Sequence, residues 1–218
     1  MINNTTVVLD KLSAFERLVI STENEFSDEL AILGNVSQQG TVDNLKRILR
    51  KLSKYCLEKK EKLFNEVFKN ITTDRAKQIA KQYVNTIQSV DPSLTYGEIE
   101  FFSFVHILQR CRPINGDIFV DLGHGTGKPL IAAALLYGDR FSKIHGIEIV
   151  PQLFEESASN IARYKSYIKD RSEFQSLQTD VSVEMGDFFE EIKDLDSFQW
   201  LNAGGYSSLP SHSNCITN

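Results

Sequence analysis

The sequence lacks a long hydrophobic run: its longest apolar stretch, Pro129 to Tyr137, is far short of the roughly 20 residues that cross a bilayer. The N-terminus has neither a basic lead nor an apolar core of signal-peptide length, which argues against secretion. Cysteine is scarce, and Cys56, Cys111 and Cys215 are too far apart to suggest a disulfide framework or a zinc cluster. We therefore expect a reduced, intracellular protein with no metal site and no membrane contact.

An excess of positive charge is also missing. The chain has 24 lysines and arginines against 29 aspartates and glutamates, so its net charge is −5 and its pI is near 5.5. Such a chain is a poor candidate for nucleic-acid binding through bulk electrostatics. With 41% hydrophobic and 24% charged residues, the composition excludes wholesale disorder. A length of 218 residues suffices for one α/β domain, or for a smaller domain with a helical appendage.

Residues 1–94 have the pattern of helices. Apolar residues recur at helical spacing from Leu12 to Val19, from Val42 to Phe68 and from Asp74 to about Val90. Pro92 follows the third stretch, as expected just beyond a helix end. The sequence therefore predicts an all-helical N-terminal region over residues 1–94.

The segment Lys46 to Lys62 within this region is locally basic. It carries eight lysines and arginines against two acidic residues, Glu58 and Glu61. The simplest interpretation is the solvated face of a long amphipathic helix. The alternative is a patch that steers the protein toward an anionic surface such as a nucleosome, with a weak contact to DNA.

Residues 95–202 predict alternating strands and helices. Thr95 has Glu98 three positions later, the capping-box spacing, which predicts the start of a Phe-rich apolar helix there. Three β-type runs follow, ending near Asp121, Ile149 and Met185, with helical patterns between them. This order is typical of the α/β fold class, with a parallel, doubly wound, Rossmann-like sheet.

A glycine loop follows the first of these strands and reads Asp121-Leu122-Gly123-His124-Gly125-Thr126-Gly127-Lys128-Pro129. A P-loop would need glycine at position 122 and Ser or Thr after the lysine, and both are missing. A dinucleotide fingerprint would need its third glycine at position 128, which is lysine. An acidic strand end followed by Gly-x-Gly-x-Gly remains, and this pattern is typical of proteins that bind S-adenosylmethionine (SAM). His124 can touch such a ligand, but we expect it to face solvent.

The strand ends offer acceptors for each part of SAM. Asp121 can accept from the ammonium group, and the glycines let the backbone approach without a Cβ clash. The N–H groups at the next helix start, together with Lys128, favour the carboxylate. Glu148 ends the second strand and can accept both ribose hydroxyls. After the third strand, Asp187 can accept from the adenine amino group while Phe188 packs on the ring.

The sequence Thr95-Tyr96-Gly97-Glu98, the glycine loop and the later Gly-Ile-Glu and Gly-Asp-Phe motifs together resemble the histone lysine methyltransferases of the DOT type (disruptor of telomeric silencing). In that family the Tyr-Gly-Glu motif lies over bound SAM. The resemblance covers about residues 94–192 and implies a nuclear methyltransferase with SAM as cofactor and histone H3 in nucleosomes as substrate. The SAM shell that it implies consists of Tyr96, Gly97, Glu98, Asp121, Gly123, His124, Gly125, Thr126, Gly127, Lys128, Glu148, Asp187 and Phe188.

Two departures from the family pattern matter. Lys128 stands where a polar amide is often found, and the Asn-containing motif that the family places after its fourth strand is absent from Leu201 to Asn218. A non-catalytic SAM-fold binding module is therefore an alternative, and a methyltransferase for a non-histone protein or a small molecule is another. Methyl transfer needs no dedicated strong base, so we assign no catalytic residue.

The chain changes character after Asn202. The family's fold has seven strands, and in its usual order the fourth lies beside the first. From Ile118 onward the pattern predicts three strands, with Phe198 to Leu201 as at most the start of a fourth. Residues 203–218 contain no Asp, Glu, Lys or Arg and are rich in Ser and Gly, which predicts a loop or a disordered tail. We therefore expect residues 95–202 to be a partial methyltransferase domain with weak or no methyl transfer.

Overall fold

The computed structural model describes residues 12–28, 31, 41–89, 94–177, 179–187 and 200–203. Helices come first along the chain: α2 (Ala14–Thr22), η1 (Asn24–Phe26), α4 (Thr41–Phe68), α5 (Thr73–Ile87) and α6 (Phe101–Cys111). Strands and helices then alternate: β1 (Ile118–Leu122), α7 (Lys128–Tyr137), β2 (Lys143–Glu148), α8 (Pro151–Lys169), η3 (Ser172–Leu177), β3 (Asp180–Met185) and β4 (Trp200–Ala203). This order confirms the predicted α/β fold class.

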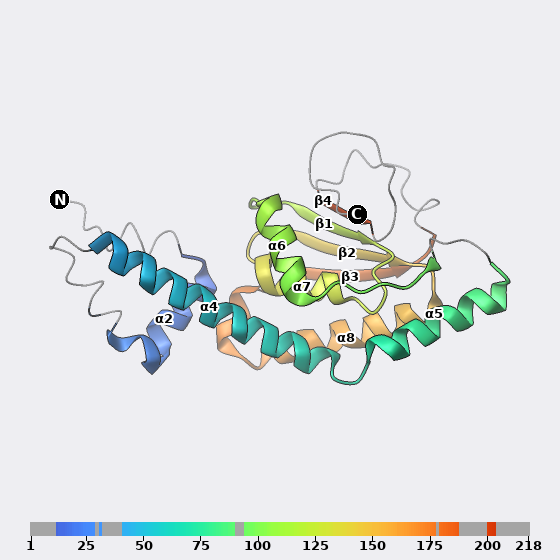
Figure 1. The fold of residues 1–218 in the computed structure, drawn as a ribbon, viewed down its shortest axis with the longest axis horizontal. Coiled ribbons are helices and arrows are strands. Elements are labelled where there is room, and N and C mark those ends of the chain that lie inside the picture. Colours follow the sequence, from blue (N-terminus) through green and yellow to red (C-terminus); the bar gives the residue numbers. More distant parts are fainter. Residues whose placement is uncertain are drawn as a thin grey trace.

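The four strands form one parallel sheet in the order β3-β2-β1-β4 (Figure 1). The pairing sets Glu148 of β2 opposite Met185 of β3, and Asp121 of β1 opposite Asn202 of β4. The fourth strand thus lies beside the first, as predicted; Phe198, where we expected its start, lies outside the described residues. Because all four strands run the same way, their carboxyl ends share one edge of the sheet.

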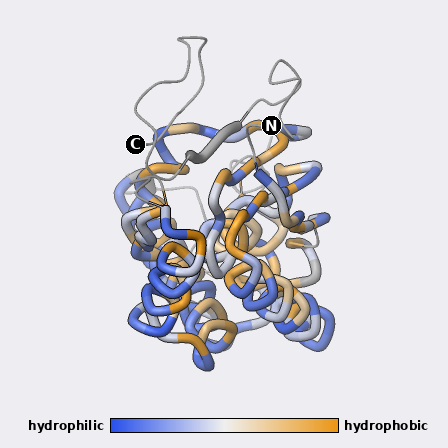
Figure 2. The backbone as a smooth tube through the Cα atoms, turned by 90° about the vertical axis from the view of Figure 1, so that its right-hand side faces the viewer, coloured by the Kyte–Doolittle hydropathy of each residue, from blue (hydrophilic) through white to orange (hydrophobic). Residues whose placement is uncertain are grey.

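Helices α7 and α8 pack against the sheet, and α4 and α5 follow one another along the long dimension of the molecule with α8 beside them (Figure 1). Helix α7 is apolar on nearly all sides, as expected for a helix buried in the molecule, and its Leu130, Ile131 and Leu135 side chains are fully buried. The outer helices instead carry both hydrophilic and hydrophobic residues within their turns, as expected for amphipathic helices (Figure 2).

One hydrophobic core joins the N-terminal helices to the sheet and its helices. Phe64 of α4 meets Phe101 of α6 with 5.0 Å between ring centroids. Phe104 of α6 in turn meets Phe119 of β1 at 6.0 Å. Such aromatic pairs stabilise a core beyond the apolar area that they bury. Packing therefore holds the helical region against the sheet at a fixed position.

The helix predicted to begin at Thr95 begins later. Helix α6 starts at Phe101, its N-cap Glu100 makes no side-chain capping bond, and residues 95–100 are not helical. The prediction is wrong because Glu98, the second half of the expected capping box, accepts hydrogen bonds from Lys128 and from the Tyr96 hydroxyl instead. A charge-assisted bond from a lysine is stronger than a local cap.

The basic segment Lys46 to Lys62 is not a uniformly solvated face. Lys59 forms an ion pair with Glu23, and Lys51 donates to the carbonyl of Glu25 at 3.1 Å. These two lysines fasten α4 to the short helix η1 and the residue before it. Their charge is therefore used within the molecule.

Lys60 departs furthest from the predicted solvated face, because it is only 9% exposed. Its Nζ donates to the carbonyl of Leu136 at 3.4 Å and lies 4.9 Å from the centroid of the Phe15 ring. Burial lowers the pKa of the Lys60 ammonium group. The exposed basic side chains that remain on this stretch are those of Lys46, Arg47, Arg50, Lys54 and Lys62.

The cysteines differ from the expectation at one position. Cys56 is free and buried, and burial raises the pKa of its thiol to about 12. Cys111 forms a disulfide, so the expectation that every cysteine is reduced is wrong there. In the ranges given above, no helix combines the length and the apolar content needed to cross a membrane. The same ranges hold no group of three or more His, Cys, Asp or Glu side chains placed to bind a metal ion.

Candidate functional site

The glycine loop leaves the carboxyl end of β1 and turns into α7. The amide of Gly123 donates to the carbonyl of Ile147 at 2.8 Å, which extends the β1–β2 ladder by one step. The amide of Gly127 donates to the carbonyl of His124 at 2.9 Å and closes the turn. Gly123, Gly125 and Gly127 have φ values of 75°, 57° and 86°, in the left-handed region that other residues adopt only at a cost. The turn therefore requires glycine at all three positions.

Two of these glycines also make room for neighbours. A Cβ atom at Gly125 would lie 2.7 Å from Cε2 of Tyr96, and one at Gly127 would lie 3.3 Å from Cβ of Ser157 on α8. At Gly123 nothing lies within 4 Å of that position. The loop is thus held between Tyr96 and α8, while the backbone at its beginning faces open space that a ligand can enter. This cradle fits SAM.

Glu148 at the end of β2 is buried and holds the loop in place. Its Oε2 accepts a hydrogen bond from the amide of Gly125 at 2.7 Å, and its Oε1 accepts one from the amide of Val150 at 2.9 Å. Burial raises the pKa of the Glu148 carboxyl, and the backbone N–H groups of Val150, Gly125 and Ile149 oppose that shift. A carboxylate has about four lone-pair sites, so the Glu148 oxygens keep acceptor capacity for a ribose hydroxyl.

The other two predicted carboxylates stand at the ends of the neighbouring strands. Asp121, the fourth residue of β1, is 1% exposed. Asp187 follows the end of β3 by two residues, and the amide of Gly186 before it donates to the carbonyl of Glu148 at 3.0 Å. The structure thus brings the three predicted carboxyl residues to one sheet edge. Phe188, which we predicted to pack on adenine, lies outside the described residues.

The segment from Tyr96 to Glu98 crosses the outer side of the loop. The Tyr96 hydroxyl donates to Oε1 of Glu98 at 2.6 Å and lies 3.4 Å from Oγ1 of Thr126. Oε2 of Glu98 accepts from Nζ of Lys128 at 2.5 Å and also from the hydroxyl of Thr73, the first residue of α5. One carboxylate therefore ties the segment, the loop and the helical region together.

The ionisation of this cluster follows from its bonds. Burial alone would raise the pKa of the Glu98 carboxyl, but the hydrogen bonds from Lys128, Thr73 and Tyr96 outweigh it and hold the pKa below its ordinary value. Burial, and the bond to ionised Glu98, raise the pKa of the Tyr96 phenol. Gly97 between them has open space where a side chain would stand.

Lys128 was predicted to serve the ligand's carboxylate, and here it bonds to Glu98. Its Nζ also lies 5.8 Å from the centroid of the Phe68 ring at the end of α4. The ammonium group stands at the first residue of α7, where the helix N-terminus favours an anion. A ligand carboxylate there would share this cation with Glu98.

The prediction that His124 faces solvent is wrong. The residue is 3% exposed, and its ring packs against Gly146 of β2, which has no Cβ to obstruct it. Its Nδ1 lies 3.0 Å from the carbonyl of Gly125, and burial lowers its pKa to about 4. Its Nε2 has no hydrogen-bond partner in the part of the chain that the structure describes. The side chain supports the loop from the sheet side.

Sequence reasoning missed three polar side chains that hold the site: Thr73, Ser157 and Asn160. Asn160 is 1% exposed and donates from Nδ2 to the carbonyl of Thr126 at 3.0 Å. Ser157, fully buried, packs against Gly127. Both stand on the buried face of α8, where a polar side chain needs a bonding partner. Polar residues at inward positions of the helical pattern were the feature that could have located them.

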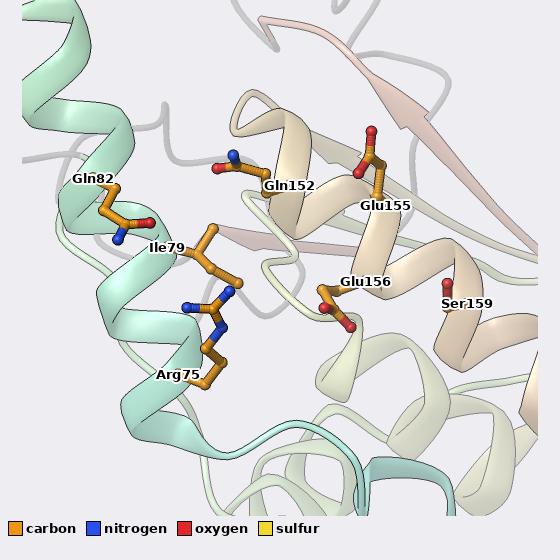
Figure 3. A pocket seen from close by; sticks show the side chains of 7 residues that line it. All are labelled: Arg75, Ile79, Gln82, Gln152, Glu155, Glu156 and Ser159. Carbon is orange, nitrogen blue, oxygen red and sulfur yellow. The ribbon is translucent and has the colours of Figure 1, made fainter.

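Hollows near the helical region, among the described residues, include two that bear on the location of the site. One, of about 370 Å³, adjoins Lys128 and has the aromatic rings of Phe64 and Phe68 in its wall. The other, of about 270 Å³, lies between α5 and α8, and Arg75 and Glu156 line it from opposite helices (Figure 3). None of the predicted cofactor residues lines the second hollow. The candidate site is the carboxyl edge of the sheet because the glycine loop and the strand-end carboxyl residues meet there.

The family model described as "Histone methylation protein DOT1" matches residues 76–195, more than half of the chain. The chain belongs to this DOT1 family. The match includes the Tyr96–Glu98 segment, the glycine loop and the ends of β1, β2 and β3. The suspected resemblance is thus confirmed, and membership of the DOT1 family makes the chain a member of a SAM-dependent methyltransferase family.

Solved structures with a similar arrangement include the YcgJ protein of Bacillus subtilis, with 13% sequence identity and a TM-score of 0.35 over 48% of this chain and 38% of that one. They also include a chain from the complex of the Haloferax volcanii Trm112 methyltransferase activator with a methyltransferase, with 21% identity and a TM-score of 0.33 over 60% of this chain and 43% of that one. This DOT1-family chain therefore spans less than half the length of either structure. No curated protein matches its sequence.

Proposed function

We propose that this DOT1-family chain is a protein-lysine methyltransferase that binds SAM and acts in the nucleus on histone H3 in nucleosomes. The observation that carries the proposal is the meeting of three features at one sheet edge: the glycine loop, buried Glu148 bonded to it, and the Tyr96–Glu98 segment packed on it. Family membership supports the reaction class. The family's description as a histone methylation protein supports the substrate class.

The loop and the start of α7 would hold the amino-acid end of SAM. Asp121 would accept from its ammonium group, beside the open backbone at Gly123. The first-turn N–H groups of α7 would receive its carboxylate, with Lys128 as the nearby cation. The Tyr96–Glu98 segment would close over this end, because the Tyr96 ring already lies against Gly125.

The ends of β2 and β3 would hold the nucleoside. Glu148 would accept the two ribose hydroxyls with the lone pairs left free by Gly125 and Val150. Asp187 would accept from the adenine amino group, with Phe188 against the ring. Together these residues fix the reactive end of the ligand relative to the loop.

When bound, SAM would supply a methyl group on its sulfonium sulfur: the neutral amine of a lysine would attack the methyl carbon in line, and the neutral thioether would leave with the electron pair of the broken S–CH₃ bond. The chain's own contribution is alignment of the two reactants and exclusion of water. The aromatic ring of Tyr96, which lies against Gly125, suits the exclusion of water, and the carboxyl groups of Asp121 and Glu148 suit the alignment of the ligand. No dedicated strong base is required.

The outer face of α4 would contribute a weak contact to nucleosomal DNA. Arg47 and Arg50 on this face are exposed. Lys46 lies 3.8 Å from Asp43 and Lys54 lies 3.7 Å from Glu58, so part of the positive charge is offset locally. We therefore propose a contact that salt screens readily.

Transfer of a radiolabelled methyl group from SAM to nucleosomes, free histones and cell extract, measured side by side, tests the proposal. We expect at most weak label in histone H3 of nucleosomes, in line with the weak transfer expected from the sequence, and none with a Glu148→Ala control. Label confined to the extract would point to a non-histone or small-molecule acceptor. SAM binding without label in any substrate would favour the non-catalytic binding module.

A further inference from the structure

Arg163 on α8 joins the end of α4 to the polar side chains beneath the glycine loop. Its Nη1 donates to the carbonyl of Val67, the penultimate residue of α4, and to Oδ1 of Asn160 at 2.9 Å. The last carbonyls of a helix have no partner within that helix. A guanidinium placed there supplies the missing donor and complements the negative helix end. Arg163 therefore bonds to the docked end of α4 through a group that needs a partner.

Asn160 carries this contact on to the loop. Its Nδ2 donates to the carbonyl of Thr126 at 3.0 Å, and the residue is 1% exposed. A guanidinium has donors only, so the amide oxygen must face Arg163 and the amide NH₂ must face Thr126. Both neighbours thus fix one orientation of the side chain. A displacement of Arg163 would therefore either break the hydrogen bond between Asn160 and Thr126 or move the Asn160 amide together with the loop.

The peptide group between Thr126 and Gly127 is held at both ends. Asn160 holds its carbonyl, and its N–H donates to the carbonyl of His124 at 2.9 Å. Ser157, one turn earlier on α8, touches Gly127 at the position that a Cβ would fill. This peptide group leads into Gly127, the N-cap residue of α7. Its orientation therefore sets the direction of the first-turn N–H groups of α7.

We propose that Arg163 and Asn160 are positioning residues that couple the docked end of α4 to the geometry of the glycine loop, and so to its affinity for SAM. The inference rests on the proposed binding of SAM by that loop. Neither residue belongs to the predicted cofactor shell, and both act through Thr126. The N-terminal helical region would then also influence the geometry of the glycine loop, through the end of α4.

Arg171 provides a matched control. It follows α8, and its Nη2 donates to Oε2 of Glu66 at 2.7 Å, so it also links α8 to the last turn of α4. Its guanidinium lies 5.5 Å from the Tyr167 ring. Removing it deletes a bond to α4 next to that of Arg163 without touching Asn160 or the loop.

The test compares Arg163→Met with Arg171→Met, because both substitutions keep an apolar stem and remove the donors. For Arg163→Met we expect SAM affinity to fall about 10-fold by calorimetry, the loss typical of a buried hydrogen bond to a charged group. We also expect faster hydrogen exchange in the loop at 121–128. For Arg171→Met we expect a similar fall in melting temperature, unchanged loop exchange and a SAM affinity within about 2-fold of wild type.

Asn160→Asp is the second variant. It keeps an acceptor for Arg163 but turns a carboxylate oxygen toward the carbonyl of Thr126, so we expect it to lose SAM affinity and loop protection even where it folds normally. Equal loop exchange in wild type, Arg163→Met and Asn160→Asp would overturn the inference, and so would equal effects of Arg163→Met and Arg171→Met. If wild type binds no SAM, the proposed function fails, while the exchange comparison still decides whether Arg163 positions the loop.

Discussion

Glu98, His124 and Glu148 are ionisable side chains with little exposure around the glycine loop, and each is stabilised in a different way. Glu148 is compensated by two backbone N–H groups, and Glu98 by the ammonium of Lys128 and two hydroxyls. The buried Nε2 of His124 has no partner among the described residues, so this side chain is stable only in its neutral form. These differences give each residue its own pH dependence.

The neutral state of His124 predicts a loss of stability in mild acid. Burial lowers its pKa from the ordinary 6.5 to about 4, so between these values the unfolded chain binds a proton that the folded chain does not. The stabilisation is therefore complete above the ordinary pKa and is lost as the pH falls to the folded value, by up to about 3 kcal/mol. Urea unfolding of wild type and His124→Phe across this range measures it. Parallel pH profiles for the two proteins would contradict the buried neutral histidine.

The lowered pKa of Glu98 predicts the behaviour of a Glu98→Gln variant. Because the folded pKa lies below the ordinary 4.5, the carboxylate contributes stability above that value, and the contribution disappears as the pH falls through the folded value. We expect Glu98→Gln to be less stable than wild type by a constant amount above about pH 5, and the difference to shrink in stronger acid. A difference that persists unchanged down to about pH 3 would show that the ion pair with Lys128 is not its source.

At the scale of elements, local sequence patterns predicted an element correctly where the burial of its own side chains decides whether it is a helix or a strand. Helix α8, Pro151–Lys169, lies where a helical pattern was predicted between two strands, and β1, β2 and β3 end within one residue of their predicted ends. The start of α6 could not be predicted, because Glu98 bonds to Thr73 and Lys128 and does not cap a helix at Thr95. Contacts between such distant residues leave no local pattern.

The orientation of His124 was unpredictable for a similar reason. Its ring fits beneath the loop because Gly146, on the neighbouring strand, has no side chain at the point of contact. The carboxylates at the strand ends could be predicted, because strand direction alone brings Asp121, Glu148 and Asp187 to the same edge. The supporting residues on α8 could not, because their partners are backbone groups of a loop whose path was unknown.

The Tyr96–Glu98 segment gives a prediction at this scale. Tyr96→Ala removes the ring that lies against Gly125, and we expect it to weaken SAM binding with little change in melting temperature, because the segment is not part of a helix. Tyr96→Phe is the control, since it keeps the ring and loses only the hydrogen bond to Glu98. Calorimetry and thermal unfolding of both variants check this. A large loss of stability with unchanged SAM affinity would mean that the segment serves packing alone.

The outer face of α4 gives a second prediction for an element. Charge reversal at Arg47, Arg50 and Lys54 should lower methylation of nucleosomes and flatten its dependence on salt, because each phosphate that these side chains neutralise releases about one counterion. The control reverses three exposed lysines elsewhere, at Lys69, Lys77 and Lys81. Methylation assays at several salt concentrations compare the two triple variants. Equal losses of methylation in the two triple variants would mean that this face of α4 is only a solvated surface.

At the scale of the whole molecule, one hydrophobic core and one polar cluster connect the helical region with the SAM-type sheet. The aromatic contacts from Phe64 through Phe101 hold α4 in place, and the bonds of Glu98 and Arg163 lead from α4 and α5 to the loop. With a net charge of −5, overall charge would not attract this molecule to DNA, so the proposed nucleosome contact depends on local arrangement. Its function therefore depends first on whether the edge of the sheet binds SAM.

Titration calorimetry of SAM into wild type, Glu148→Ala and Asp121→Ala tests that claim most directly. We predict binding by wild type and a loss of affinity of at least about 10-fold in each variant, since each removes a buried acceptor for a polar group of the ligand. Thermal unfolding of the same samples identifies any variant that fails to fold. Wild-type affinity in both folded variants, or no binding of SAM by wild type, would contradict the account.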